Sequence, residues 1–132
     1  MITYLWIAIG GAIGSVARFA GSNLVTGWLG ESFPWGTLIV NVSGSFVIGF
    51  VAALTGPDGR ALVSGDMRQF VMVGLCGGYT TFSAFSLQTL QLIQHGEPVR
   101  AGLNIAGSVV LCLIAVWLGY AAAAALNLAK GS

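Results

Sequence analysis

The chain has 132 residues, of which 56% are hydrophobic and 7% are charged, and its formal net charge at pH 7 is +1. Because soluble domains carry about 25% charged residues, this composition excludes an ordinary soluble domain and indicates an integral membrane protein. The near-zero net charge removes the electrostatic basis for binding nucleic acid. Apolar segments follow one another along the chain, so we interpret residues 1–132 as a single transmembrane domain.

The first apolar segment, residues 3–25, is uncharged except for Arg18. It exceeds the roughly 20 apolar residues that a membrane-spanning helix needs. Gly10 and Gly14 form a small-xxx-small pattern, which allows a neighbouring helix to approach closely. Arg18 lies near the end of the segment, from where its long side chain can reach the membrane interface.

The second segment, residues 36–54, is interrupted by polar side chains. Thr37 and Asn41 are four residues apart and therefore share one face of a helix. An asparagine within the membrane needs a hydrogen-bond partner to offset its desolvation. The charged stretch 55–68 that follows, with Asp58 and Arg60 in it, is predicted to be a solvated loop.

The third segment, residues 69–94, carries two glycines and several hydroxyls near its middle. Gly77 and Gly78 weaken a helix there by about 1 kcal/mol each relative to alanine, and Thr80 or Thr81 would then cap a second half-helix. A helix broken at membrane depth leaves free carbonyl and N–H groups, with which transporters hold ions. The alternative is an unbroken helix that is thin at the glycines so that a neighbour packs closely.

Beyond these threonines, aromatic and hydroxyl side chains recur at helical spacing. Phe82 and Phe85 are three residues apart, as are Ser83 and Ser86, so each pair occupies one helix face. The positive edge of a phenyl ring can hold a small anion without a fixed cation. The same spacing is also typical of packing in the core or against lipid.

The fourth segment, residues 99–126, places Asn104 and Ser108 four residues apart on one face. The four segments together predict an all-α membrane protein of four transmembrane helices, with the third helix broken near its middle. Four short helices cannot enclose a pathway alone, which favours a homo-oligomer.

The few charged residues restrict both mechanism and orientation. None of the predicted spans contains an acid, which argues against proton coupling, and the sequence has no pattern of a catalytic or metal-ligating cluster, which argues against an enzyme. Four spans put Arg60, Arg68 and Lys130 on one side of the membrane, and Arg100 and Arg18 on the other. This bias is too weak to set the orientation, so a single orientation and a dual topology both remain open.

Three stretches resemble the CrcB/Fluc family of fluoride channels. They are Gly-Gly-Ala-Ile-Gly-Ser-Val-Ala-Arg at 10–18, Gly-Thr-Leu-Ile-Val-Asn-Val-Ser-Gly-Ser-Phe at 36–46 and Gly-Leu-Cys-Gly-Gly-Tyr-Thr-Thr-Phe-Ser-Ala-Phe-Ser at 74–86. The resemblance implies an antiparallel, dual-topology homodimer in the bacterial inner membrane with two pores along its interface. Such a channel passes fluoride passively and relieves its toxicity.

The resemblance also implies roles for individual residues. Backbone carbonyls of Gly77 and Thr80, from both subunits, are expected to hold a central Na⁺. The expected ion pathway comprises Phe82 and Phe85 lining the pore, Asn41 contacting the ion, Thr37 near the entrance, and a polar row of Ser83, Ser86, Asn104 and Ser108. Arg18 matches the arginine of the family's first segment. Ala84 and Gln88 depart from the threonine and glutamate of many relatives, which affects the exit path.

Two other functions remain as alternatives. A proton-coupled antiporter of the small-multidrug-resistance type also has four short helices, but it needs a glutamate within the membrane, and Glu31 and Glu97 both lie in predicted loops. The other alternative is a membrane subunit without transport activity, whose glycines and hydroxyls only pack helices.

Overall fold

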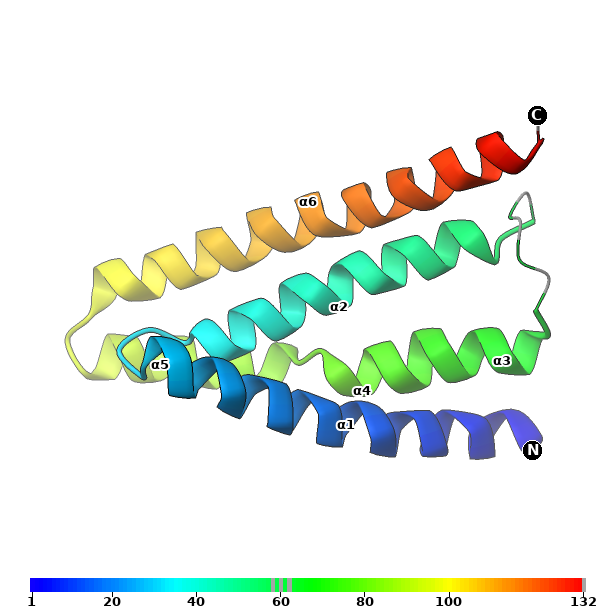
Figure 1. The fold of residues 1–132 in the computed structure, drawn as a ribbon. Helices are drawn as coiled ribbons and strands as arrows, with labels where there is room; N and C mark the ends of the chain where they lie inside the picture. Colours follow the sequence, from blue (N-terminus) through cyan, green and yellow to red (C-terminus); the bar gives the residue numbers. More distant parts are fainter. Residues whose placement is uncertain (58, 60, 62, 132) are drawn as a thin grey trace.

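The computed structural model describes residues 1–57, 59, 61 and 63–131, and every regular element in these ranges is a helix (Figure 1). Four helical stretches are long and apolar enough to cross a membrane, as predicted. The first two are α1 (Ile2–Leu29) and α2 (Trp35–Leu54). The third is divided into α3 (Gly65–Gln69), η1 (Phe70–Cys76), α4 (Gly77–Tyr79) and α5 (Phe82–Gln94), and the fourth is α6 (Pro98–Gly131). Asp58 and Arg60 of the predicted solvated loop lie outside the described residues. The side chain of Lys130, which was counted in the charge bias, also lies outside them.

Capping residues explain where these helices begin and end. The third stretch begins at Gly65, four residues before the predicted start at 69, because the Ser64 hydroxyl accepts a hydrogen bond of 3.1 Å from the Met67 N–H. Asp66 in that first turn also complements the helix dipole. Gly30 follows the last residue of α1 with a φ of 86°, a left-handed conformation that glycine adopts without strain.

Glycines bring α1 into close contact with the third stretch. A Cβ atom added to Gly10 would lie 2.6 Å from the carbonyl oxygen of Phe70, and one added to Gly14 would overlap the carbonyl of Leu75. The close approach predicted from this glycine pair is therefore confirmed. Figure 1 shows α1 running along α3 and α4 on one side of the molecule.

The helices α2 and α6 form the other closely packed pair and lie side by side in Figure 1. A Cβ atom on Gly49 would overlap the Val116 carbonyl, and one on Gly119 would overlap the Phe46 carbonyl. Small residues also dominate the buried core, which includes Ala53, Ala101, Ala115 and Ala123. Membrane helices associate through such close backbone packing because lipid is as apolar as their side chains.

Candidate functional site: a broken helix beside a cavity

The third stretch is broken, and the break lies at Thr80 and Thr81. Thr80 (φ −85°, ψ 158°) and Thr81 (φ −153°, ψ 115°) are extended, whereas Gly77 and Gly78 remain helical within α4. A Cβ atom on Gly78 would lie 2.6 Å from the carbonyl oxygen of Gly11. Gly78 therefore serves the close helix packing that was the alternative interpretation of the glycines, while the threonines carry the break.

Hydroxyl groups close both ends of the break. The Thr81 hydroxyl caps α5 by accepting a hydrogen bond of 3.1 Å from the Ala84 N–H, so the predicted cap is confirmed for Thr81. The Thr80 hydroxyl instead donates to the carbonyl of Cys76 at 2.9 Å, and the Thr80 N–H donates to the same oxygen at 3.0 Å. Each half-helix thus has one of its terminal backbone groups satisfied by a threonine hydroxyl.

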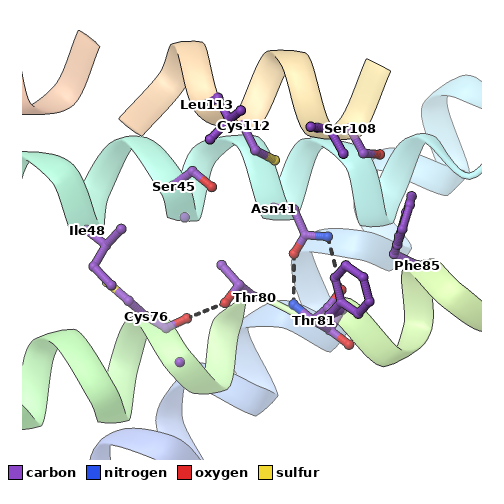
Figure 2. Close-up of a pocket in the computed structure, with 14 residues that line it drawn as sticks. Asn41, Ser45, Ile48, Cys76, Thr80, Thr81, Phe85, Ser108, Cys112 and Leu113 are labelled. Carbon is purple, nitrogen blue, oxygen red and sulfur yellow. Dashed lines mark hydrogen bonds between the residues drawn. The ribbon is translucent and has the colours of Figure 1, made fainter. Parts of the chain in front are cut away.

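Asn41 on α2 holds the extended backbone of Thr81 (Figure 2). Its Nδ2 donates to the Thr81 carbonyl at 3.0 Å, and its Oδ1 accepts from the Thr81 N–H at 2.8 Å. Extended backbone at membrane depth is stable only where such groups are satisfied by protein. The partner that Asn41 was predicted to need is therefore the break itself, and the second N–H of its amide is left for another acceptor.

The break leaves two backbone carbonyls without the N–H donors that they would have in a continuous helix. In a continuous helix the Thr81 N–H would bond to the carbonyl of Gly77, and the Ala84 N–H would bond to the carbonyl of Thr80. These N–H groups donate instead to Asn41 and to the Thr81 hydroxyl. The carbonyls of Gly77 and Thr80 are thus among those that the break frees from their helical donors, and they are the two that the resemblance predicts to hold Na⁺, a hard cation that takes oxygen ligands.

Arg18 lies against the end of the first half-helix. Its Nε donates to the carbonyl of Gly78 at 3.1 Å. A cation at this place complements the negative end of the helix dipole. The Arg18 side chain is only partly exposed. Its hydrogen bond to the Gly78 carbonyl places its charge beside the break, on the α1 side.

A cavity of about 410 Å³ borders the break. Its lining includes six residues of the predicted site, namely Asn41, Gly77, Thr80, Phe82, Phe85 and Ser108. The two phenylalanine rings lie 5.3 Å apart at an interplanar angle of 52°. Phe85 is buried at 9% exposure, whereas Phe82 is 77% exposed. The structure therefore brings amide, hydroxyl, carbonyl and aromatic groups together in one cavity.

The other residues of the predicted pathway are placed elsewhere. Ser83 and Ser86 lie on the exposed side of α5, where the Ser86 hydroxyl donates to the Phe82 carbonyl at 2.9 Å. Thr37 is buried in the first turn of α2, outside the cavity lining. Asn104 is 2% exposed and lies behind the lining.

Asn104 links α5 and α6 through a buried chain of hydrogen bonds. Its Nδ2 donates to the Thr89 hydroxyl at 2.9 Å, and its Oδ1 accepts from the Ser108 hydroxyl at 3.3 Å. The Thr89 hydroxyl in turn donates to the Phe85 carbonyl at 2.7 Å. Within the chain as described, Asn104 supports the cavity wall and Ser108 faces the cavity.

Sequence reasoning missed four lining residues that carry polar or thiol groups, namely Ser45, Cys76, Thr81 and Cys112. Cys112 follows Asn104 and Ser108 at the same four-residue spacing, so the helical period was a sufficient signal. Ser45 lies four residues beyond Asn41, and the same period would have found it. Thr81 was predicted only as a cap, because nothing local to it indicates its contact with Asn41, 40 residues away.

A second, more polar cavity of about 570 Å³ lies at the opposite end of α5 from the break. Its lining includes Gln88, Gln91, His95, Glu97 and Arg100. Among the described side chains, the Oε1 atom of Gln88 is buried without a hydrogen-bond partner. Phe85 and Gln88 are one helical turn apart, so this face of α5 passes from the first cavity to the second.

Comparison with known proteins identifies similar chains. The family model for "CrcB-like protein, Camphor Resistance (CrcB)" matches residues 5–120. A protein of Opitutus terrae named fluoride-specific ion channel FluC is 63% identical over the full length of both chains. Proteins with the same name from Rhodospirillum rubrum and Methylocella silvestris are 60% and 59% identical, and the matches cover 96% or more of each chain.

Proposed function

This chain belongs to the CrcB family, and from that membership we propose that it is a fluoride-selective channel that lets fluoride leave the bacterial cytoplasm passively across the inner membrane. The family is one of transporters, so the chain is not an enzyme. Its four apolar helices make it a multi-pass membrane protein. Channel activity would relieve fluoride toxicity without an energy source.

The observation that carries this proposal is the cavity at the helix break. Fluoride is small and tightly hydrated, so a selective path must replace its water with closely placed donors. The free N–H of Asn41 and the ring edges of Phe82 and Phe85 are neutral donors of that kind. Because no cation is among the cavity-lining residues, the ion is not held so tightly that its release is slow.

We further propose that Na⁺ lies at the break. The carbonyls of Gly77 and Thr80 would hold it, since their helical donors are redirected to Asn41 and Thr81. When bound, the ion supplies a buried positive charge near the anion path. Replacing Na⁺ by a large organic cation on both sides of the membrane is expected to lower fluoride efflux. Efflux that is indifferent to Na⁺ would contradict this part of the proposal.

The assembly we propose is an antiparallel, dual-topology homodimer with its pathways along the interface. Phe82 lines the cavity and yet is 77% exposed in the single chain, so a second copy is the simplest cover for it. Helices from that copy would complete the cavity wall. The weak bias of Lys and Arg between the two ends is compatible with insertion in either direction.

The proton-coupled antiporter is less well supported. Among the described residues, Glu31 lies between α1 and α2, and Glu97 lies before α6, where it pairs with Arg100 at 3.3 Å. Asp66 lies in the first turn of α3 and accepts a hydrogen bond from Thr3. These acids are all at helix ends, whereas proton coupling needs a carboxylate along the path.

Growth in fluoride tests the proposal in cells. A bacterium that lacks its own fluoride channel is expected to grow in fluoride when it expresses this chain. Expression of the Phe82→Ile variant at the same membrane level is the matched control, and we expect it to restore growth poorly. Failure of the wild-type chain to restore growth, with the protein present in the membrane, would contradict the proposed function.

A further inference from the structure

Residues of α2 contact each residue at the break in turn. The Ser43 hydroxyl lies 2.9 Å from the hydroxyl of Tyr79, which is the last residue of α4. Gly44 faces the next residue, because a Cβ atom there would overlap the methyl group of Thr80. Asn41 holds the backbone of Thr81. One short segment of α2 therefore contacts all three residues from Tyr79 to Thr81.

The direction of the bond between Ser43 and Tyr79 follows from the hydroxyl inventory. A serine hydroxyl has a single proton, and that of Ser43 is donated to the Val40 carbonyl of its own helix at 3.1 Å. Tyr79 is therefore the donor, and Ser43 accepts. Replacing Tyr79 by phenylalanine removes this one donor and leaves the bond from Ser43 to Val40 in place.

The two contacts hold opposite sides of the break. Asn41 fixes the Thr81 side, from which α5 continues with Phe82, and Tyr79 fixes the end of α4, which carries the carbonyls of Gly77 and Gly78. Thr80, between them, lines the cavity. Without the Tyr79 bond the end of α4 would keep only its packing contacts to α2, and the spacing across the break would widen.

Resting on the proposed channel function, we propose that Tyr79, through the hydrogen bond that it donates to Ser43, is a positioning residue for ion selectivity. It holds the cavity wall at the spacing that suits fluoride. A path built from donors at a fixed, close spacing discriminates between anions by size, and a looser spacing admits the larger chloride ion. Tyr79 itself does not line the cavity, so it acts on the ion only by positioning Thr80 and Thr81, which do line it.

The test compares Tyr79→Phe with wild type in liposomes, measuring fluoride efflux and chloride efflux separately. We expect the ratio of fluoride to chloride efflux to fall about two- to tenfold, which is the range that one neutral hydrogen bond can produce. Tyr120→Phe is the matched control, because Tyr120 is 55% exposed on α6, and its ratio is expected to equal that of wild type. A variant that only folds less well has fewer channels but an unchanged ratio, and that result would overturn the inference.

Substitutions of Ser43 provide the second, independent measurement. Ser43→Ala is expected to lower the same ratio, whereas Ser43→Thr keeps a hydroxyl and is expected to preserve it. Because both single variants remove the same bond between Tyr79 and Ser43, the ratio of the double variant Ser43→Ala/Tyr79→Phe should be no lower than that of the lower single variant. Additive effects in the double variant would contradict the inference, and so would a normal ratio in Ser43→Ala.

The experiment also separates this inference from the proposed function. If the wild-type protein passes no fluoride, the channel proposal fails and the inference fails with it. If the wild-type protein is selective for fluoride and the Tyr79→Phe ratio is unchanged, the channel proposal stands and only the positioning role is lost.

Discussion

At the scale of single residues, Asn41 joins the break to the cavity. Its carbonyl oxygen and one of its N–H groups hold Thr81, and the side chain also lines the cavity at the same point. An amide has a second N–H, which can donate to an anion while the first keeps the backbone in place. Structural support and ion contact are therefore compatible in this one side chain.

Asn41→Asp tests this combination. A carboxylate cannot donate to the Thr81 carbonyl, and its charge repels fluoride, so we expect fluoride efflux to fall at least about tenfold, equivalent to about 1.4 kcal/mol on the barrier. The measurement is fluoride efflux per folded protein, with folding checked by size-exclusion chromatography. A wild-type rate in this variant would remove Asn41 from the pathway.

Phe82→Ile and Phe85→Ile test the aromatic pair. Both rings line the cavity, so losing their polarised edges is expected to lower fluoride efflux sharply while the protein stays assembled. Phe19→Ile is the matched control, because Phe19 is 70% exposed on α1 and outside the cavity. Normal efflux in both cavity variants would mean that the rings serve packing alone.

At the scale of elements, the third stretch is shaped by its neighbours on both sides. Glycines let α1 lie directly against η1 and α4, and α2 supplies the polar groups that replace the interrupted helix bonds. The break therefore depends on tertiary contacts more than on the helix propensity of its own residues.

Gly14→Ala tests the packing of α1. Its new methyl group would overlap the Leu75 carbonyl, and such overpacking costs about 1–3 kcal/mol. We expect a lower thermal midpoint in detergent. Gly27→Ala on the same helix has open space around it and serves as the control, with an unchanged or slightly higher midpoint. Equal midpoints in the two variants would show that the contact is loose.

Particular residues show how much of the fold and of the candidate site could be predicted from the sequence. Long apolar runs predicted the four helices, and the hydroxyls after Gly78 predicted the break. The sequence also predicted Thr80 or Thr81 as the cap beyond the break, but not that Gly77 and Gly78 stay helical, because the extended backbone of Thr81 is held by Asn41, which lies 40 residues away in the chain. Ser83 has a helical spacing consistent with the predicted row but is exposed outside the cavity, since spacing alone does not say which face of α5 meets α6.

At the scale of the whole molecule, both termini lie at the same end of the bundle (Figure 1). Joining two copies directly by a short linker therefore forces them to be parallel, whereas inserting one additional membrane-spanning helix makes them antiparallel. We expect fluoride efflux only from the fusion that contains the inserted helix. Efflux from the direct fusion alone would contradict the antiparallel dimer.

Paired anion efflux from liposomes tests the central claim most directly. Purified wild-type protein is reconstituted with fluoride and chloride inside and no proton gradient, and the two anions are measured by separate ion-selective electrodes. We predict rapid fluoride efflux with negligible chloride efflux, which distinguishes a passive selective channel from a proton-coupled antiporter and from a subunit without transport activity. No anion efflux, or equal efflux of the two anions, would contradict it.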